Sequence, residues 1–126
     1  MDNNAHPTFG VKRIFNAVKF SWMGIKATWK TEAAFREEII LGIFLLPAAF
    51  FLGETLTQTA ILIIPLFIVL ITELLNTGIE HVVNRISLEH HKLSGQAKDV
   101  GSAAVFLANI LTVIVWTLVA LDRFLF

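Results

Sequence analysis

Hydrophobic and polar positions in the first quarter of the chain follow a helical period. Large apolar side chains recur at steps of three and four residues, at Val11, Phe15, Val18, Trp22, Ile25 and Trp29. Another flank of the same predicted helix carries the lysines Lys12, Lys19, Lys26 and Lys30. A basic amphipathic helix with tryptophans, here over about residues 8–30, is typical of a helix that lies in the membrane interface. The alternative is a helix that packs on the protein's own apolar segments.

Three longer apolar segments follow, and each is a candidate membrane span. They cover residues 33–53, 59–86 and 98–121. The first reaches the roughly 20 residues that a span needs only if its charged start is counted. Pro47 predicts a kink or a local loss of helical hydrogen bonds in it, and Pro65 a bend in the second segment.

Short polar stretches separate these segments. Thr31 is the candidate N-cap of the helix that opens the first span. Residues 53–58 predict a tight loop, and residues 87–96 predict the one substantial polar loop. Asn109 is the only strongly polar residue in the middle of a span, where we expect a hydrogen bond between helices.

Composition narrows the class of protein. Hydrophobic residues make up 56% of the 126 residues and charged residues only 16%, which is more apolar surface than one small soluble domain can bury. We therefore expect an all-α integral membrane protein with a single domain over residues 1–126. The formal net charge is zero, so nucleic acid is not an expected partner. There is no cysteine, which excludes disulfides and thiolate metal sites.

The distribution of basic residues predicts the orientation. Six of the ten Lys and Arg residues precede the long apolar run that begins at Ile39, and residues 53–58 contain none. By the positive-inside rule, the N-terminus and residues 87–96 are cytoplasmic and the C-terminus lies on the far side. No continuous apolar core follows the first basic residues, so we do not expect a signal peptide. This topology places six polar residues in one cytoplasmic layer: Glu32, Glu73, Asn76, Glu80, Lys98 and Asp99.

The polar residues at the end of the second span suggest chemistry. Glu73, Asn76 and Glu80 are spaced i, i+3 and i+7, so they point from one face of a helix. A carboxylate at the centre of a span costs roughly 2.5–3.5 kcal/mol on insertion scales, which favours a functional reason for keeping it. Carboxylates suit Mg²⁺, a further carboxylate can act as general base, and a lysine can bind phosphate.

These residue types point to phosphoryl transfer at the membrane surface, although no Walker-type loop and no protein-kinase signature is present. A small transporter and a non-catalytic membrane subunit are the alternatives. A carrier is expected to hold ionisable groups near the midplane, often within inverted repeats, and neither feature is seen. For Glu73, the alternative to catalysis is an ion pair with Lys98.

Three segments resemble the prokaryotic diacylglycerol kinase family: residues 32–36 (EAAFR), 73–80 (ELLNTGIE) and 89–104 (EHHKLSGQAKDVGSAA). The resemblance extends from about Arg13 to Trp116. It implies a homotrimer of three-span subunits in the bacterial inner membrane, each with an amphipathic surface helix. It also implies transfer of the γ-phosphate of ATP to membrane diacylglycerol, giving phosphatidic acid, in active sites that lie between subunits near the cytoplasmic face.

The resemblance also implies roles for single residues. Glu73 matches the general base, and Glu32 and Glu80 match the Mg²⁺ ligands. The positions that match ATP contacts are Arg13, Phe20, Glu32, Asn76, Glu80, Glu89, His91, Lys98 and Asp99. The positions that match lipid-substrate contacts are Ser21, Trp22, Glu73, Ser102 and Trp116.

Two positions depart from the family's pattern. Phe20 stands where the family often has tyrosine, so a hydroxyl contact to the nucleotide is missing. Asn84 stands where aspartate is usual, which either weakens repulsion around the metal and nucleotide or weakens their binding. Neither departure affects the proposed base or metal ligands. An undecaprenol kinase of the same fold is the nearest alternative, although residues 94–104 look closer to the diacylglycerol branch.

Overall fold

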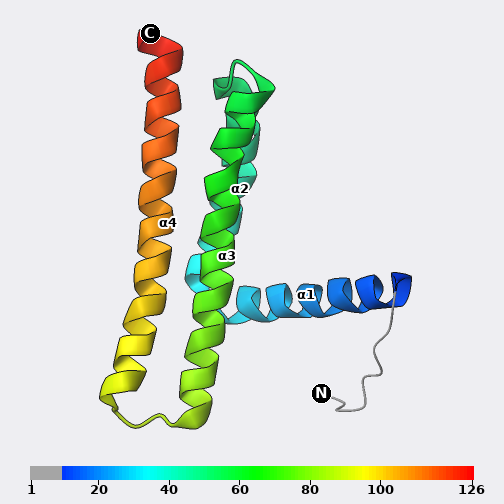
Figure 1. Cartoon of the computed structure of the whole chain (residues 1–126), viewed down its shortest axis with the longest axis vertical. Helices are drawn as coiled ribbons and strands as arrows, with labels where there is room; N and C mark the ends of the chain where they lie inside the picture. Colours follow the sequence, from blue (N-terminus) through cyan, green and yellow to red (C-terminus); the bar gives the residue numbers. More distant parts are fainter. Residues whose placement is uncertain (1–9) are drawn as a thin grey trace.

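The computed structural model describes residues 10–126, and this part of the chain forms four helices (Figure 1). They are α1 (Val11–Thr31), α2 (Ala33–Leu52), α3 (Leu56–Ile86) and α4 (Lys92–Leu125). α3 and α4 pack against each other along their lengths in opposite directions, and α2 packs mainly on α3. α1 runs across the direction of the other helices instead of along it. The expected all-helical fold is confirmed.

The start and end of α1 differ from the sequence-based expectation. The expected start at residue 8 lies outside the described residues, and α1 begins at Val11 after Gly10, whose φ of 77° favours glycine. Thr31 was expected to cap the next helix, and this prediction is wrong. Thr31 is the last residue of α1, and its Oγ1 donates a hydrogen bond to the carbonyl of Ala27 at 3.1 Å. The N-cap position of α2 is Glu32, in extended backbone.

A single arginine holds the corner between α1 and α2. The last carbonyls of a helix have no partner within the helix and need another donor. Nη1 of Arg36 donates to the carbonyl of Trp29 at 2.6 Å and to that of Lys30 at 3.3 Å. Because Arg36 belongs to the first turn of α2, these bonds set the direction in which α1 leaves the other helices.

The α2–α3 and α3–α4 connections are shorter than the loops predicted over residues 53–58 and 87–96. α3 begins at Leu56, and Oγ1 of Thr55 caps it by accepting a hydrogen bond from the N–H of Gln58 at 3.1 Å. α4 begins at Lys92, where Nδ1 of His91 accepts from the N–H of Leu93 at 3.1 Å. The prediction of a loop over residues 87–96 is therefore wrong in its second half, which is the first turn of α4.

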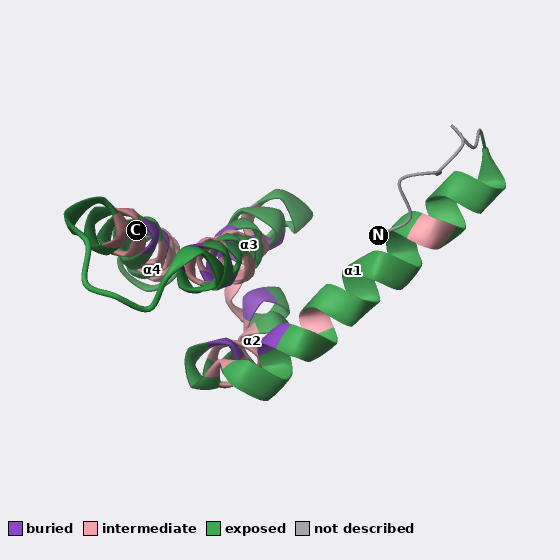
Figure 2. Ribbon diagram, turned by 90° about the horizontal axis from the view of Figure 1, so that it is seen from below, coloured by how far each residue is buried: buried purple, intermediate pink, exposed green. Residues whose placement is uncertain are grey.

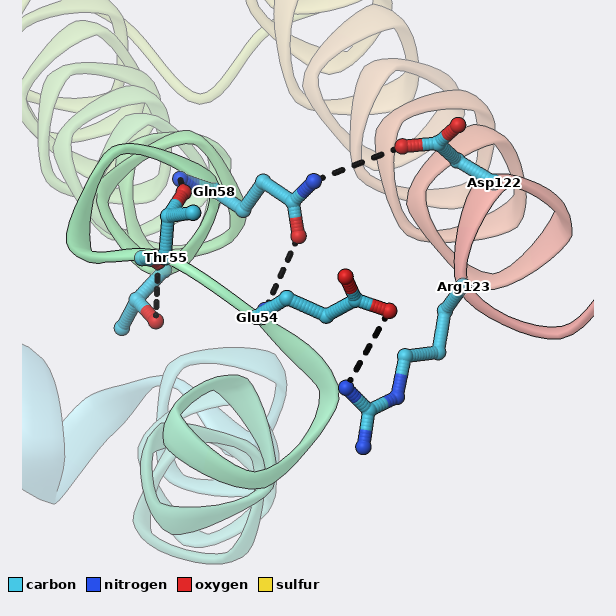
Figure 3. Close-up of polar contacts among 6 residues, drawn as sticks. Glu54, Thr55, Gln58, Asp122 and Arg123 are labelled. Carbon is cyan, nitrogen blue, oxygen red and sulfur yellow. Dashed lines mark hydrogen bonds and ion pairs between the residues drawn. The ribbon is translucent and has the colours of Figure 1, made fainter. Parts of the chain in front are cut away.

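Polar side chains join the α2–α3 connection to the end of α4 (Figure 3). Glu54 and Arg123 form an ion pair at 3.3 Å. Nε2 of Gln58 donates to Asp122 at 3.3 Å, and Oε1 of Gln58 accepts from the N–H of Glu54 at 2.9 Å. The end of the molecule opposite the α3–α4 connection is thus tied together by side chains from three segments.

Neither proline ends its helix: α2 continues past Pro47 and α3 past Pro65. A proline inside a helix removes one backbone donor and disturbs the carbonyls of the preceding turn. In that turn of α3, the carbonyl of Leu62 accepts a hydrogen bond from the indole Nε1–H of Trp116 on α4 at 3.1 Å. Trp116 therefore joins α4 to α3 beside the proline.

We expect Trp116→Phe to lower the free energy of unfolding by about 0.5–1.5 kcal/mol, because the Leu62 carbonyl loses its cross-helix donor. Reversible unfolding in mixed micelles would measure the change. Trp22→Phe is the matched control, since Trp22 is 60% exposed and makes no side-chain hydrogen bond among residues 10–126. Equal stability of both variants would contradict a bracing role for Trp116.

α3 and α4 are each long and apolar enough to cross a membrane. Many large apolar side chains on them point away from the protein, including Phe67, Phe106 and Leu118, each at least 57% exposed. α2 does not meet the same criterion, because Arg36, Glu37 and Glu38 occupy its first turns. These features fit a membrane protein.

Buried positions lie on the facing sides of the helices (Figure 2). On α3 they form a stripe at steps of mostly three and four residues: Thr59, Leu62, Pro65, Val69, Glu73, Thr77 and Val83. Glu73 is the only charged member of this stripe. The packing of α3 therefore places one carboxyl group on the inner side of the molecule.

Candidate active site

Glu73 is the centre of the candidate site. Its exposed fraction is 6%, although it carries an ionisable group and lies on a helix that can cross a membrane. Three other carboxyl groups, those of Glu32, Glu38 and Glu80, are near enough to act on it electrostatically. Burying a charge among like charges is unfavourable. A cation or a proton at Glu73 would relieve this repulsion.

Asn76 and Glu80 extend this cluster by one turn each along α3. Nδ2 of Asn76 donates to Oε1 of Glu80 at 3.5 Å. The other amide atom, Oδ1 of Asn76, is buried and has no hydrogen-bond partner among the described residues. This oxygen lies against Gly101 of α4. A buried acceptor without a partner is costly, at about 1–3 kcal/mol.

A cleft of about 420 Å³ lies beside the cluster, where α1 meets α3. Both helices contribute to its lining, which combines apolar side chains with a few hydroxyl groups and one imidazole: Ser21, Gly24, Ile25, Ala27, Thr28, Leu74, Thr77, Gly78 and His81. Thr77, which lies one turn after Glu73 on the buried side of α3, lines the cleft, whereas the carboxyl groups of the cluster do not. The volume is in the range of small-molecule sites.

The remaining predicted contacts are spread over the chain. Arg13 and Phe20 lie on the part of α1 that projects away from the other helices, and Phe20 is 65% exposed (Figure 1). Glu89 and His91 belong to the exposed connection between α3 and α4. Within one chain the structure therefore does not bring these four residues to Glu73.

Residues on α4 are closer to the cluster. Lys98 is half-buried and lies one turn before Gly101, whereas Asp99 and Ser102 are exposed. Among residues 10–126 the only ion pair joins Glu54 and Arg123. Glu73 is therefore not neutralised by Lys98, and the alternative of a purely structural ion pair between them is not seen.

Asn109 on α4 differs from the sequence-based expectation. Asn109 was expected to hydrogen-bond between helices, and this prediction is wrong: its Nδ2 donates to the carbonyl of Val105 in its own helix at 3.1 Å. Asn109 instead lines an apolar groove of about 530 Å³ formed by α2, α3 and α4, together with Trp116 and Glu38.

Glu38 was missed by the sequence analysis. It is half-buried, and its charge reaches Glu73. Glu38 follows Phe35 by three residues and so shares the packed side of α2, but the burial of Phe35 is known only from the structure. Arg36, Glu37 and Glu38 are consecutive charged residues, so the sequence does not show that Glu38 is half-buried whereas Glu37 is exposed.

The donor set fits a hard divalent cation that is shared with a substrate. No group of three or more His, Asp or Glu side chains lies at metal-binding spacing in the described part of the chain. Mg²⁺ takes only one or two protein carboxylates and completes its octahedral shell with phosphate oxygens and water. The half-buried carboxylate of Glu80, which Nδ2 of Asn76 contacts, can supply one such ligand.

The chain is similar to known proteins over most of its length. A sequence model described as prokaryotic diacylglycerol kinase matches residues 19–120. A protein from Haemophilus influenzae named diacylglycerol kinase is 45% identical over 111 residues, covering 88% of this chain and 94% of its own length. Relatives of the same name from Escherichia coli and Pseudomonas aeruginosa are 42% and 44% identical, covering 95% and 89% of this chain and 98% and 91% of their own. The chain belongs to the prokaryotic diacylglycerol kinase family.

Proposed function

We propose that the protein transfers the γ-phosphate of ATP to the hydroxyl group of membrane diacylglycerol, giving phosphatidic acid. The relatives' name, diacylglycerol kinase, supports the reaction. The observation that carries the assignment to a site is the buried carboxyl group of Glu73 beside the Asn76–Glu80 pair. A buried carboxyl group on a helix that can cross a membrane suits a general base for a lipid substrate.

The proposed mechanism is a direct transfer without a phosphoenzyme. Glu73 accepts the proton of the lipid hydroxyl while the oxygen of that hydroxyl forms a bond to the γ-phosphorus, and the bond from that phosphorus to the bridging oxygen of ADP breaks. Lys98 offsets negative charge on the triphosphate. Glu32 and Glu80 would hold Mg²⁺, which when bound neutralises phosphate oxygens. Positioning supplies much of the catalysis in this class of reaction.

The proposed assembly is a homotrimer in the bacterial inner membrane, with α2, α3 and α4 as three spans and α1 in the cytoplasmic interface. Two features support it. Arg13, Phe20, Glu89 and His91 are remote from Glu73 in one chain, as expected if a neighbouring subunit completes each site. The apolar side chains of α1 are largely exposed, for example Val11 at 84% and Phe15 at 69%, as expected for a helix bathed in lipid.

The first experiment gives purified protein in mixed micelles labelled ATP, Mg²⁺ and either diacylglycerol or undecaprenol. Labelled phosphatidic acid is the expected product. Label on undecaprenol alone would identify the protein as an undecaprenol kinase that uses the same proposed mechanism. No label on either lipid would contradict the proposal and favour a non-catalytic subunit.

A further inference from the structure

Gly101 of α4 is a residue to which neither the sequence nor the family comparison gave a role in the reaction. We propose that Gly101 is a positioning residue, which holds the Asn76 amide in place beside Glu80 because it has no side chain. This inference rests on the proposed function, since it assigns Asn76 and Glu80 to the binding of Mg·ATP.

The geometry at this point is unusually close. Gly101 is buried where α4 crosses α3. A Cβ atom added to Gly101 would overlap Oδ1 of Asn76, and it would lie 3.1 Å from Cγ and 3.7 Å from Cα of the same residue. Only a hydrogen atom at this position leaves room for the amide as it stands.

The displaced group would be a side chain and not a backbone. Oδ1 and Cγ of Asn76 can move by rotation about the side-chain bonds, whereas Cα lies at an ordinary contact distance from the added Cβ. The helices can therefore keep their packing, and the amide must turn. Because Ala is favoured over Gly inside a helix, this substitution also adds local helix stability.

Turning the amide changes the site in two ways. It breaks the hydrogen bond from Nδ2 of Asn76 to Oε1 of Glu80, which at 3.5 Å is already long. It also withdraws Oδ1, the buried acceptor that has no partner within residues 10–126. Both changes disturb the Asn76–Glu80 pair that the proposed function assigns to Mg·ATP, so the loss appears in Mg·ATP binding before it appears in the fold.

The test compares Gly101→Ala with Gly95→Ala, which lies on the same helix and whose added Cβ would meet nothing within 4 Å. Equilibrium binding of a non-hydrolysable ATP analogue with Mg²⁺ is measured alongside thermal unfolding. We expect Gly101→Ala to weaken analogue binding about tenfold, as loss of one charge-assisted hydrogen bond would. We expect Gly95→Ala to bind as the wild type does, and both variants to unfold near the wild-type temperature.

A double-mutant cycle makes the inference specific to Asn76. In the Asn76→Ala background there is no amide to displace, so adding Gly101→Ala should cause no further loss of analogue binding. A second full loss in that background would overturn the proposal. If Gly101→Ala alone does not fold, recovery of folding in the double variant supports the same clash, and failure of the double variant to fold overturns it.

This binding measurement separates the inference from the proposed function. It needs no lipid, so its result does not depend on which lipid is phosphorylated. Wild-type protein that binds no Mg·ATP analogue would reject the proposed function itself. Wild-type binding that Gly101→Ala leaves intact would reject only the role of Gly101.

Discussion

Replacing Glu73 by glutamine is expected to lower lipid phosphorylation by about 10²–10⁴-fold, because the lipid hydroxyl loses the group that accepts its proton. Glutamine has nearly the same shape and carries no charge. Burying it among Glu32, Glu38 and Glu80 is therefore easier than burying a carboxylate, and the variant should fold. Steady-state rates with saturating Mg·ATP and lipid give the loss, and analogue binding should stay within a factor of a few of the wild type.

Glu37→Gln is the matched control for this experiment. Glu37 is an exposed acid on α2 and is not among the charges that act on Glu73. Near-normal turnover in Glu73→Gln would exclude Glu73 as the base. Loss of analogue binding in parallel with turnover would instead assign Glu73 to the nucleotide site.

Replacing Glu80 by glutamine is expected to raise the Mg²⁺ concentration for half-maximal activity by about 10–100-fold. The reason is the loss of one charge-assisted interaction, typically worth about 1.5–3 kcal/mol. Glutamine retains an oxygen that can accept from Nδ2 of Asn76, so the change removes charge and leaves the neighbouring amide in place. A titration of activity with Mg²⁺ at fixed ATP measures the shift.

Glu54→Gln provides the comparison for Glu80→Gln. It removes a carboxylate from the same chain, at the end where Glu54 pairs with Arg123. Its Mg²⁺ titration should match the wild type, and its exposed ion pair should contribute less than about 1 kcal/mol to stability. Identical titrations for the two variants would argue against metal ligation by Glu80.

Hydrophobic periodicity predicted the helices well because each long apolar run is also a helix in the structure. Helix ends were harder to predict. Residues 92–96 are polar and read as loop, yet His91 caps them and α4 starts there. Thr31 is a residue type that often caps a helix, but α1 includes it and the chain turns only at Glu32. There Arg36 donates hydrogen bonds to two of the last carbonyls of α1.

From the sequence, the candidate site could be predicted only for residues that lie on the same helix. The spacing of Glu73, Asn76 and Glu80 places them on one face of α3, and Glu73 on that face is buried in the structure. The inward side of α2 could not be read from three consecutive charges, so Glu38 was missed. The approach of Gly101 to Asn76 depends on the distance between two helices, which no local pattern encodes. The chemical roles came from the family resemblance.

The crosswise direction of α1 has a consequence for bilayers of different thickness. In the proposed arrangement, α1 lies at the level of the lipid headgroups and adjoins α3 at Thr77. It therefore fixes how deep Glu73 lies below the cytoplasmic surface of the membrane. Spans adjust to thinner or thicker hydrocarbon by tilting or by moving their ends. The end of the molecule where Glu54 and Arg123 pair would then move relative to the bilayer. The distance between the Glu73 carboxyl group and the lipid hydroxyl would stay unchanged.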